Sequence, residues 1–590
     1  MLTFSRTDTT VQIIDPCGET LAEIPTLVSE LPISVSAEPL PGGLRLTYHA
    51  DADLPMKSEL HIPAVTVKPD DLLVIPHFEG FAFRADDPRE IVSRHSQMLG
   101  GRISMSFWGI VRNGCYILTA VITNIDANFH MPREEGVNRP HIAFLPEKGR
   151  WGYDRELRIL CGEGGISEMC QAYRKIADEK GLRVPFSEKV KKLPDIDRLV
   201  GAADVWLWND DAMHKLYDAD AVYHVPDKEQ VDRRLEVADE MKALGMDKVL
   251  WSIFDENIER REVGHAKSLG WITTYYDIYT DVIPHDILDL KPATRRERCK
   301  PRIDCWPDGI LIDSAGNKAS AWQLKGKDGI FHNQNRVCDI AMYECASKVA
   351  PEHCRKYGLD GRFIDVTAGG ATECYSDAHP TTRRTSFEYK NRLFDMLHEN
   401  GMFTGTEVGC EDVASTLDYN EGLLSPTLHR MPDAGRRMTH IYRGDQIEPQ
   451  IKDFMLYPEL RVPLWELVYH GCVQSYWYWG DSANCMPELI WLRDMFCCLW
   501  GLPEIYSFRV SDWEQLKNEI IASYQRTAPT AKAAGYAVME RFDYLDDSRL
   551  IQRSEFSNGV SVVANFSDSD YNYRGVCVKA HSTKTFSCNK

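Results

Sequence analysis

The sequence predicts a multidomain protein with an N-terminal antiparallel β-sandwich, a central (β/α)8 barrel of the TIM type and a C-terminal β-sandwich. The first part of the chain is rich in alternating and β-branched runs, the middle alternates strand-like with helix-like segments, and the tail returns to strands. The 590 residues, 43% of them hydrophobic, suffice to bury a core in each part. We expect a sandwich with a trailing helix at 1–182, a linker at 183–200, the barrel at 201–508 and the C-terminal sandwich at 509–590.

The N-terminal part shows the pattern of antiparallel strands. Runs such as RISMSFWGIVR and CYILTAVITNI are separated by Pro, Gly and Asp residues. A helix follows in ISEMCQAYRKIADEKGL, where Met169, Tyr173 and Ile176 share one face and Gly181 ends the helix. The next segment, VPFSEKVKKLPDIDRL, is polar and bounded by proline, so we expect it to be a linker.

The middle of the chain alternates strands with helices. GAADVWLW has the pattern of a strand, and the helix EQVDRRLEVADEMKALG follows it. Apolar residues recur there at three- and four-residue steps: Val231, Leu235, Ala238 and Met241. DKVLWSIF and WITTYYDIY continue as strands, and RRTSFEYKNRLFDMLHENG as a helix. This alternation predicts a parallel sheet, and its length of about 310 residues fits an eightfold barrel with insertions. In the tail, Asn558 and Gly559 predict a hairpin turn.

The composition excludes several classes of function. The net charge of −20 argues against nucleic-acid and anionic-membrane partners, because both need a basic surface. No apolar run reaches the length of a membrane span, and the N-terminus lacks the basic and apolar regions of a secretory signal. The 17 cysteines are scattered without a CxxC pair, which argues against a zinc ribbon and favours a reducing compartment. We therefore expect a cytoplasmic protein with a neutral or weakly charged substrate.

Two carboxylates stand at the ends of consecutive predicted barrel strands. Asp365 closes the apolar run in GRFIDVTAGG, and Glu407 closes the run in GMFTGTEVGC. Active-site residues of α/β barrels lie at the C-terminal ends of the strands. Two acids placed there are typical of a glycoside hydrolase, which uses a pair of carboxyl groups for catalysis. The structural alternatives are a helix cap or arginine partner for Asp365 and an ion-pair partner for Glu407. The pairing of the two favours catalysis.

Three further segments hold the side chains that bind sugars: acids and amides for hydroxyl groups, and aromatic rings for the C–H face. FDEN follows one predicted strand, YYDIYTD ends the next, and YWYWGD lies late in the barrel. The expected substrate-binding residues are Asp255, Asn257, Tyr275, Asp277, Trp479 and Asp481. Packing in the core is the alternative for at least half of the late aromatic residues, and His470 is expected to be structural.

A metal site is the rival account. Glu373, Asp377 and His379 supply oxygen and nitrogen ligands within seven residues, but they lack the paired histidines of a helical zinc site. We therefore expect no metal or other cofactor to be required for catalysis. A structural calcium ion is compatible with the acidic composition, but the sequence does not locate one.

These motifs resemble those of glycoside hydrolase families 101 and 129, the endo-α-N-acetylgalactosaminidases and the intracellular α-N-acetylgalactosaminidases. FIDVTAGGATECYSDAHPTTR is similar to the nucleophile strand and loop of that group, and TGTEVG to its acid/base strand. Asp255 and Asn257 resemble its ligands of sugar hydroxyls, and Trp322 in ASAWQLKG resembles a tryptophan that packs on the sugar. The resemblance is strong from about 201 to 508. His470-Gly471 departs from a His-Asp pair expected in many relatives.

The resemblance implies a retaining, exo-acting α-glycosidase, most simply an α-N-acetylgalactosaminidase that acts on small glycans or glycopeptides. Asp365 would be the nucleophile and Glu407 the acid/base, which needs Glu407 to hold a proton while Asp365 is ionised. Three alternatives stay open at this point: an α-galactosidase or another exo-α-glycosidase on the same barrel, a carbohydrate-binding relative without activity, and a metal-dependent hydrolase.

Overall fold

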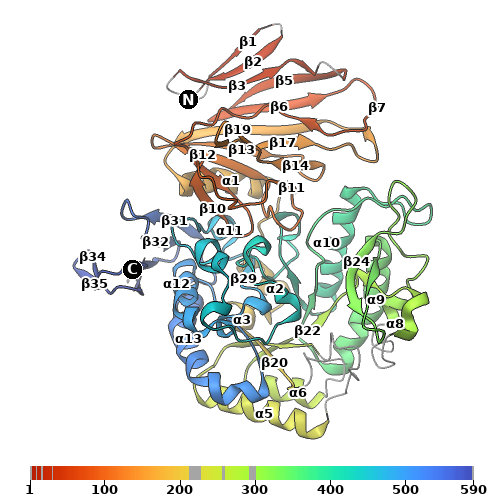
Figure 1. The fold of residues 1–590 in the computed structure, drawn as a ribbon, viewed down its shortest axis with the longest axis vertical. Coiled ribbons are helices and arrows are strands. Elements are labelled where there is room, and N and C mark those ends of the chain that lie inside the picture. The colour runs from red at the N-terminus through yellow and green to blue at the C-terminus, as the bar shows by residue number, and fades with distance from the viewer. Residues whose placement is uncertain are drawn as a thin grey trace.

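The computed structural model describes residues 3–7, 9–14, 18–28, 31–210, 227–254, 260–290 and 300–587. It has three parts, a sheet-rich N-terminal part, a barrel surrounded by helices and a small C-terminal group of sheets (Figure 1). This architecture confirms the predicted fold class. None of the described helices is long and apolar enough to cross a membrane.

The N-terminal part is built from antiparallel sheets. The large sheet contains, in spatial order, β10 (Phe81–Arg84), β9 (Leu72–Ile75), β12 (Phe107–Arg112), β13 (Cys115–Val121), β19 (Arg155–Glu163), β6 (Gly43–His49), β5 (Ile33–Leu40) and β4 (Leu27–Val28). A second sheet contains β11 (His95–Gln97), β14 (Ala127–His130), β17 (His141–Phe144) and β8 (Leu60–His61). A third contains β1 (Thr3–Arg6), β2 (Thr10–Ile14) and β3 (Thr20–Pro25). Two short pairs complete this part, β15 (Arg133–Glu134) with β16 (Val137–Asn138) and β18 (Arg150–Trp151) with β7 (Leu54–Pro55).

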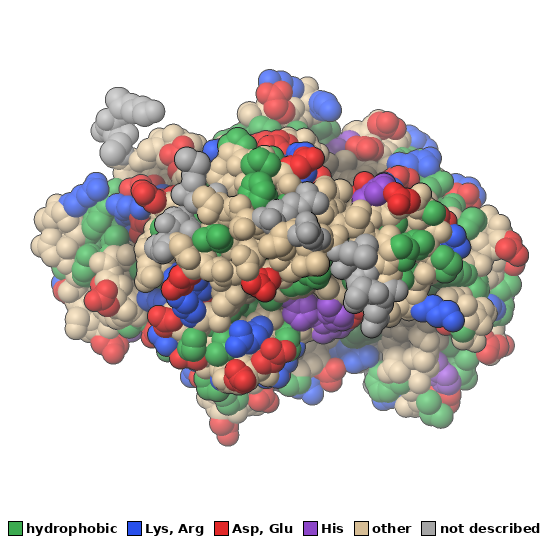
Figure 2. All heavy atoms as spheres, turned by 90° about the horizontal axis from the view of Figure 1, so that it is seen from above, with side chains coloured by type: hydrophobic (Ala, Val, Ile, Leu, Met, Phe, Trp, Pro, Cys, Tyr) green, Lys and Arg blue, Asp and Glu red, His purple; other side chains and the backbone are tan. Residues whose placement is uncertain are grey.

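Alternation of buried and exposed residues explains why these segments form strands. In β19 the inward residues, such as Leu157 and Ile159, are buried, while their neighbours are partly exposed. The following helix α1 (Ile166–Glu179) buries Met169, Tyr173 and Ile176, the residues predicted to share one face. On the face seen from the sandwich end, acidic and basic side chains of the described residues are interspersed (Figure 2).

The segment 183–200 differs from its prediction as a linker. It contains two short helices, α2 (Phe186–Lys192) and α3 (Ile196–Leu199), which bury Phe186, Ile196 and Leu199. Lys189 is buried as well, and its ammonium group donates to the carbonyl of Leu417. The prediction was wrong because the segment is mostly polar and its three apolar residues are few. These three residues are buried and hold the segment against the rest of the protein.

The central sheet is wholly parallel. In spatial order it contains β29 (Gln474–Tyr476), β28 (Tyr419–Glu421), β27 (Phe403–Glu407), β26 (Gly361–Ile364), β22 (Ile272–Asp277), β21 (Val249–Ile253), β20 (Ala203–Trp208) and β30 (Ile505–Arg509). Each strand pairs with its neighbour in chain order, and β30 returns to pair with β20. Within the described residues only β29 and β30 lack a ladder between them. The sheet is therefore a barrel with one open seam.

Helices connect most of the barrel strands, as the alternating pattern predicts. They are α5 (Lys228–Ala243), α6 (Arg260–Ser268), α9 (Asp339–Tyr357), α10 (Arg383–Glu399), α11 (Leu464–Tyr469) and α12 (Ile490–Trp500), and α13 (Trp513–Ala534) follows the last strand, β30. Asp227 caps α5, because its side chain accepts a hydrogen bond from the backbone of Gln230 at 2.9 Å. Val231, Ala238 and Met241 of α5 are buried against the barrel.

An insertion between β22 and α9 builds one rim of the barrel. It contains the short helices η1 (His285–Leu290) and α8 (Lys300–Ile303), and a sheet in the order β23 (Asp281–Val282), β25 (Phe331–Arg336) and β24 (Ser320–Lys325). The C-terminal part contains β31 (Met539–Tyr544), β32 (Ile551–Phe556), β33 (Val560–Asn565) and β36 (Ser582–Ser587), with the hairpin β34 (Tyr571–Tyr573) and β35 (Val576–Val578). The predicted turn at Asn558 and Gly559 is confirmed, since β32 and β33 pair as a hairpin and Gly559 has φ +86°.

Candidate active site

Asp365 and Glu407 occupy equivalent positions at the ends of adjacent strands. In the ladder between β26 and β27, Ile364 lies opposite Thr406, so the next residue of each strand is one of the two acids. Neighbouring strands lie about 4.7–4.9 Å apart, and residues in register on a sheet point to the same face. Sheet geometry therefore places the two carboxyl groups side by side at one end of the barrel.

Both acids line one cavity of about 420 Å³. The cavity is lined from the ends of five barrel strands (β21, β22, β26, β27 and β29), from the rim insertion and from the loop that carries Arg430. The lining residues that carry the argument below are Phe254, Tyr276, Trp322, Arg430, Tyr478 and Trp479. A volume of this size is typical of a small-molecule site. The cavity combines a few polar groups with several aromatic walls.

Gly405 makes room for this arrangement two residues before Glu407. A Cβ atom at this position would lie 2.1 Å from the ring of Tyr419, so a side chain there would displace the ring from the barrel interior. The glycine in the TGTEVG motif is thus explained by close packing inside the barrel.

Asp365 is buried and accepts two hydrogen bonds. The hydroxyl of Tyr276 donates to Oδ2 at 2.7 Å, and the backbone N–H of Val366 donates to Oδ1 at 3.1 Å. Burial raises the pKa of Asp365 well above its ordinary value, and the negative charge of Glu407 and a hydrogen bond with it act in the same direction. Tyr276 opposes this rise by stabilising the carboxylate. Burial and the neighbouring carboxyl group therefore act together in raising the pKa of Asp365.

Glu407 is held by Arg430. Nη1 of Arg430 lies 3.3 Å from Oε1 of Glu407, and the guanidinium group stacks on the ring of Tyr478, with its carbon 3.8 Å from the ring centroid. Nε of Arg430 donates to the carbonyl of Ser425 at 2.8 Å and lies 3.8 Å from Oδ2 of the buried Asp481. These contacts fix Arg430 as a cation beside the cavity.

The residue after each acid has a strained backbone. Val366 has φ +46° and Val408 has φ +47°, a region that β-branched residues rarely adopt. Such a conformation costs on the order of 1–3 kcal/mol and persists only where the surrounding structure enforces it. The matching strain at both positions turns the chain sharply out of each strand directly after its carboxylate.

A second carboxyl pair lies inside the barrel. Asp204 at the base of β20 and Glu421 at the end of β28 are fully buried. Burial raises the pKa of Asp204 to about 7, although Ser252 donates to it at 2.5 Å. Burial and the charge of Asp204 raise the pKa of Glu421, and the charges of Asp365 and Glu407 add to this rise. Two acidic pairs thus interact electrostatically within one barrel.

Aromatic rings form the walls of the cavity. Trp479 packs edge-on against Trp206 with ring centroids 5.1 Å apart, and it lies 5.6 Å from Tyr276. Trp322 projects from the insertion strand β24 and is 50% exposed, with the guanidinium group of Arg436 4.5 Å from its ring. An exposed tryptophan at the mouth of a cavity offers a face for an apolar surface of a ligand.

The structure places Trp322 and Trp479 at the cavity, as expected of substrate-binding residues. Tyr275 lies elsewhere: it is on the outer face of β22, where its ring faces His353 of α9 at a centroid distance of 6.2 Å. The expectation for Tyr275 is corrected, because side chains alternate along a strand and the inward position belongs to Tyr276.

Asp277 and Asp481, which we expected to bind substrate, are not among the residues that line this cavity. Asp277 forms an ion pair with the buried Arg362; burial opposes ionisation, but Arg362 and Arg302 lower the pKa of Asp277 below its ordinary value. Asp481 is fully buried behind Arg430, and burial raises the pKa of its carboxyl. Asp481 therefore orients Arg430 and does not face the cavity.

Asp255 and Asn257 lie outside the described residues. The rival metal ligands do not gather: Glu373 accepts from the backbone of Lys148 at 2.7 Å, and Asp377 is exposed. Sequence reasoning missed Tyr276 by one position in YYDIY. It missed Arg430 and Tyr478 as partners of Glu407, for which the sequence carries no separate signal.

A parallel eight-stranded barrel that brings two carboxyl groups together at the ends of adjacent strands defines the chain as a glycoside hydrolase. Comparison with protein families supports this class and narrows it. The family described as "Glycosyl hydrolases related to GH101 family, GH129" matches residues 240–555, which is more than half of the chain. The protein belongs to this family, as the resemblance predicted.

Solved structures of the α-N-acetylgalactosaminidase NagBb from Bifidobacterium bifidum are similar to this chain. The ligand-free enzyme has a TM-score of 0.66 and 17% identity, over 96% of this chain and 90% of that chain. Its GalNAc complex has a TM-score of 0.69 and 17% identity, over 100% and 91% of the two chains. At this identity the likeness shows a shared fold. A comparison with curated protein sequences finds no match.

Proposed function

We propose that this chain is a retaining, exo-acting α-N-acetylgalactosaminidase for small glycans or glycopeptides, with Asp365 as nucleophile and Glu407 as acid/base. The observation that carries the proposal is that the two carboxyl groups are in register on adjacent strands and line the same cavity. Retaining glycosidases place their carboxyl groups about 5–5.5 Å apart, and inverting ones about 6.5–9.5 Å. Adjacent strands about 4.7–4.9 Å apart favour the retaining geometry.

In the first step Oδ of Asp365 forms a bond to the anomeric carbon while the glycosidic C–O bond breaks. Glu407 gives its proton to the departing oxygen. In the second step Glu407 takes a proton from water, the oxygen of that water bonds to the anomeric carbon, and the bond to Asp365 breaks. The sugar leaves with its original anomeric configuration.

The contacts around Asp365 favour its ionised form once a sugar is bound. In the free site, burial and then the negative charge of Glu407 keep the pKa of Asp365 high. A sugar bound between them separates the pair, and Tyr276 and the N–H of Val366 then stabilise Asp365 as the carboxylate. Ionised Asp365 can then act as the nucleophile, while Glu407 acts as the acid/base.

The size of the cavity and the relatives support exo action and GalNAc. About 420 Å³ accommodates one sugar unit and part of an aglycone, with Trp322 and Trp479 as apolar walls. NagBb, which shares the fold, is an α-N-acetylgalactosaminidase with a known GalNAc complex. We extend that activity to this chain as part of the proposal.

Hydrolysis of aryl α-GalNAc and aryl α-galactoside tests the proposal. The wild-type protein should prefer the GalNAc substrate and release its α anomer first, as detected by NMR. Asp365→Asn should lower kcat by about 10⁴-fold or more, whereas Glu407→Gln should retain more activity on substrates with good leaving groups. Asp377→Asn, a change of an exposed acid in the loop after Asp365, is the matched control and should leave activity unchanged.

Each result has a defined meaning. Near wild-type activity in Asp365→Asn would contradict the catalytic assignment. The β anomer as first product would contradict retention, and a preference for the galactoside would replace the proposed sugar while leaving the catalytic pair intact.

A further inference from the structure

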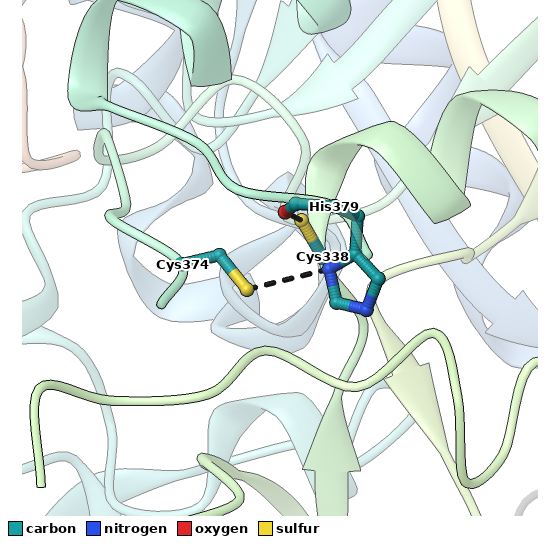
Figure 3. A group of neighbouring side chains, drawn as sticks. All are labelled: Cys338, Cys374 and His379. Carbon is teal, nitrogen blue, oxygen red and sulfur yellow. Dashed lines mark hydrogen bonds between the residues drawn. The ribbon is translucent and has the colours of Figure 1, made fainter. Parts of the chain in front are cut away.

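We propose that Cys338, Cys374 and His379 bind one zinc ion, which fastens the loop that follows the nucleophile strand to the start of helix α9. The three side chains are buried, and their ligand atoms all lie within 4.8 Å of one another. Figure 3 shows the two sulfur atoms and the imidazole ring near one another, with Cys338 at the start of α9 and Cys374 and His379 in the loop after Asp365. None of the three lines the catalytic cavity.

The distances suit a tetrahedral metal ion. Sγ of Cys374 lies 3.3 Å from Nδ1 of His379. Zinc bonds of about 2.3 Å to sulfur and about 2.0–2.1 Å to nitrogen place such ligands about 3.6 Å apart, and two sulfurs about 3.8 Å apart. The Cys374–His379 pair therefore matches this geometry to within a few tenths of an ångström, and the sulfur of Cys338 lies within 4.8 Å of both ligand atoms. Two thiolates and one imidazole are soft ligands that favour zinc over calcium or magnesium.

The hydrogen bond made by Nε2 of His379 leaves Nδ1, the nitrogen that faces Cys374, free to bind a metal ion. Nε2 lies 2.5 Å from the carbonyl oxygen of Asp308. Because a carbonyl can only accept, Nε2 carries the hydrogen and Nδ1 presents its lone pair to Cys374. Orientation of a metal-binding histidine by a carbonyl on its other nitrogen is the usual arrangement around zinc.

The sulfur of Cys374 is also held in position by a hydrogen bond from the backbone. The backbone N–H of Ile312 donates to it at 3.4 Å. A donor on this sulfur helps to orient it as a metal ligand.

The position of the site indicates what the ion does. Cys374 and Thr381 exchange two backbone hydrogen bonds of 2.9 and 3.1 Å, which close a small loop around His379. Cys338 is the N-cap residue of α9. Zinc would thus hold the connection from Asp365 to α10 against α9, and it would act on stability and loop order without taking part in the reaction.

Metal analysis of the full-length protein, purified with a reducing agent and without chelators, tests the proposal. We expect about one zinc ion per chain, and its loss in Cys374→Ser and in His379→Ala. Two control variants should keep the zinc. Cys170→Ser changes a buried cysteine on α1, and His130→Ala changes the rival cluster of Glu59, His61 and His130.

Two measurements on the wild-type protein do not depend on how the variants fold. Exchange of zinc for cobalt should give a sulfur-to-cobalt charge-transfer band, and removal of the zinc should lower Tm. Cys374→Ser should show no band and no change of Tm with added zinc. The proposal is overturned if the wild type takes up no zinc, or if His130→Ala loses the zinc while Cys374→Ser keeps it. It is also overturned if mass spectrometry finds a Cys338–Cys374 disulfide in protein expressed in a reducing cytoplasm.

Discussion

The hydroxyl group of Tyr276 offers a sharp test of the catalytic geometry. Tyr276→Phe removes the 2.7 Å hydrogen bond to Asp365 and leaves the ring in place. That ring packs against Phe254, Phe363 and Trp479, with centroids 4.5, 6.0 and 5.6 Å away, so the cavity wall should keep its shape. The change therefore isolates one donor to the proposed nucleophile.

The magnitude follows from the kind of bond. A hydrogen bond to a charged group contributes about 1.5–3 kcal/mol, which corresponds to a factor of about 10 to 150 in rate. We expect kcat/KM to fall by that factor, because the carboxylate form of Asp365 loses a stabilising donor. Since Tyr276 opposes the rise in the pKa of Asp365, its removal raises that pKa further. Asp365 must be ionised to attack, so the ascending limb of the pH profile should move to higher pH.

The assay is kcat/KM for an aryl α-GalNAc as a function of pH. Tyr275→Phe is the matched control, because it removes the adjacent hydroxyl on the outer face of the same strand and should leave kcat/KM within about two-fold. The reasoning would be refuted if Tyr276→Phe kept wild-type kcat/KM and an unmoved ascending limb, or if Tyr275→Phe produced the same loss.

Two further predictions concern the mouth of the cavity and the pH dependence of stability. Trp322→Ala should raise KM by about ten-fold with little change in the free energy of unfolding, because the ring is 50% exposed; Phe331→Ala, an exposed ring that does not line the cavity, should leave KM unchanged. Glu79 is buried, and burial raises its pKa from 4.5 to about 8 in the folded protein. The stability that its protonated form provides is therefore lost as the pH rises from about 4.5 to about 8. Urea unfolding of Glu79→Gln should show a shallower fall over this window, whereas parallel curves for the two proteins would contradict the prediction; the exposed Glu38→Gln is the control.

The fold was largely predictable because each part of the chain has its own hydrophobic period. The period of two in β19 and the helical period in α5 are visible in the sequence, and both elements form where these patterns occur. The segment 183–200 was misjudged, because its few apolar residues become anchors only when a barrel surface is present to receive them.

The sequence by itself determined that Asp365 and Glu407, the pair proposed to be catalytic, lie side by side. Asp365 and Glu407 end consecutive strands joined by one helix, and a βαβ unit makes such strands neighbours in a parallel sheet. Only the tertiary structure decided which side chains join them. Side chains alternate between the two faces of a strand, and the local sequence does not show whether Tyr275 or Tyr276 faces inward. Arg430 reaches the site from a loop, which has no periodic pattern to predict its position. Contacts between distant segments depend on how the strands close into a barrel, and that closure is a property of the whole chain.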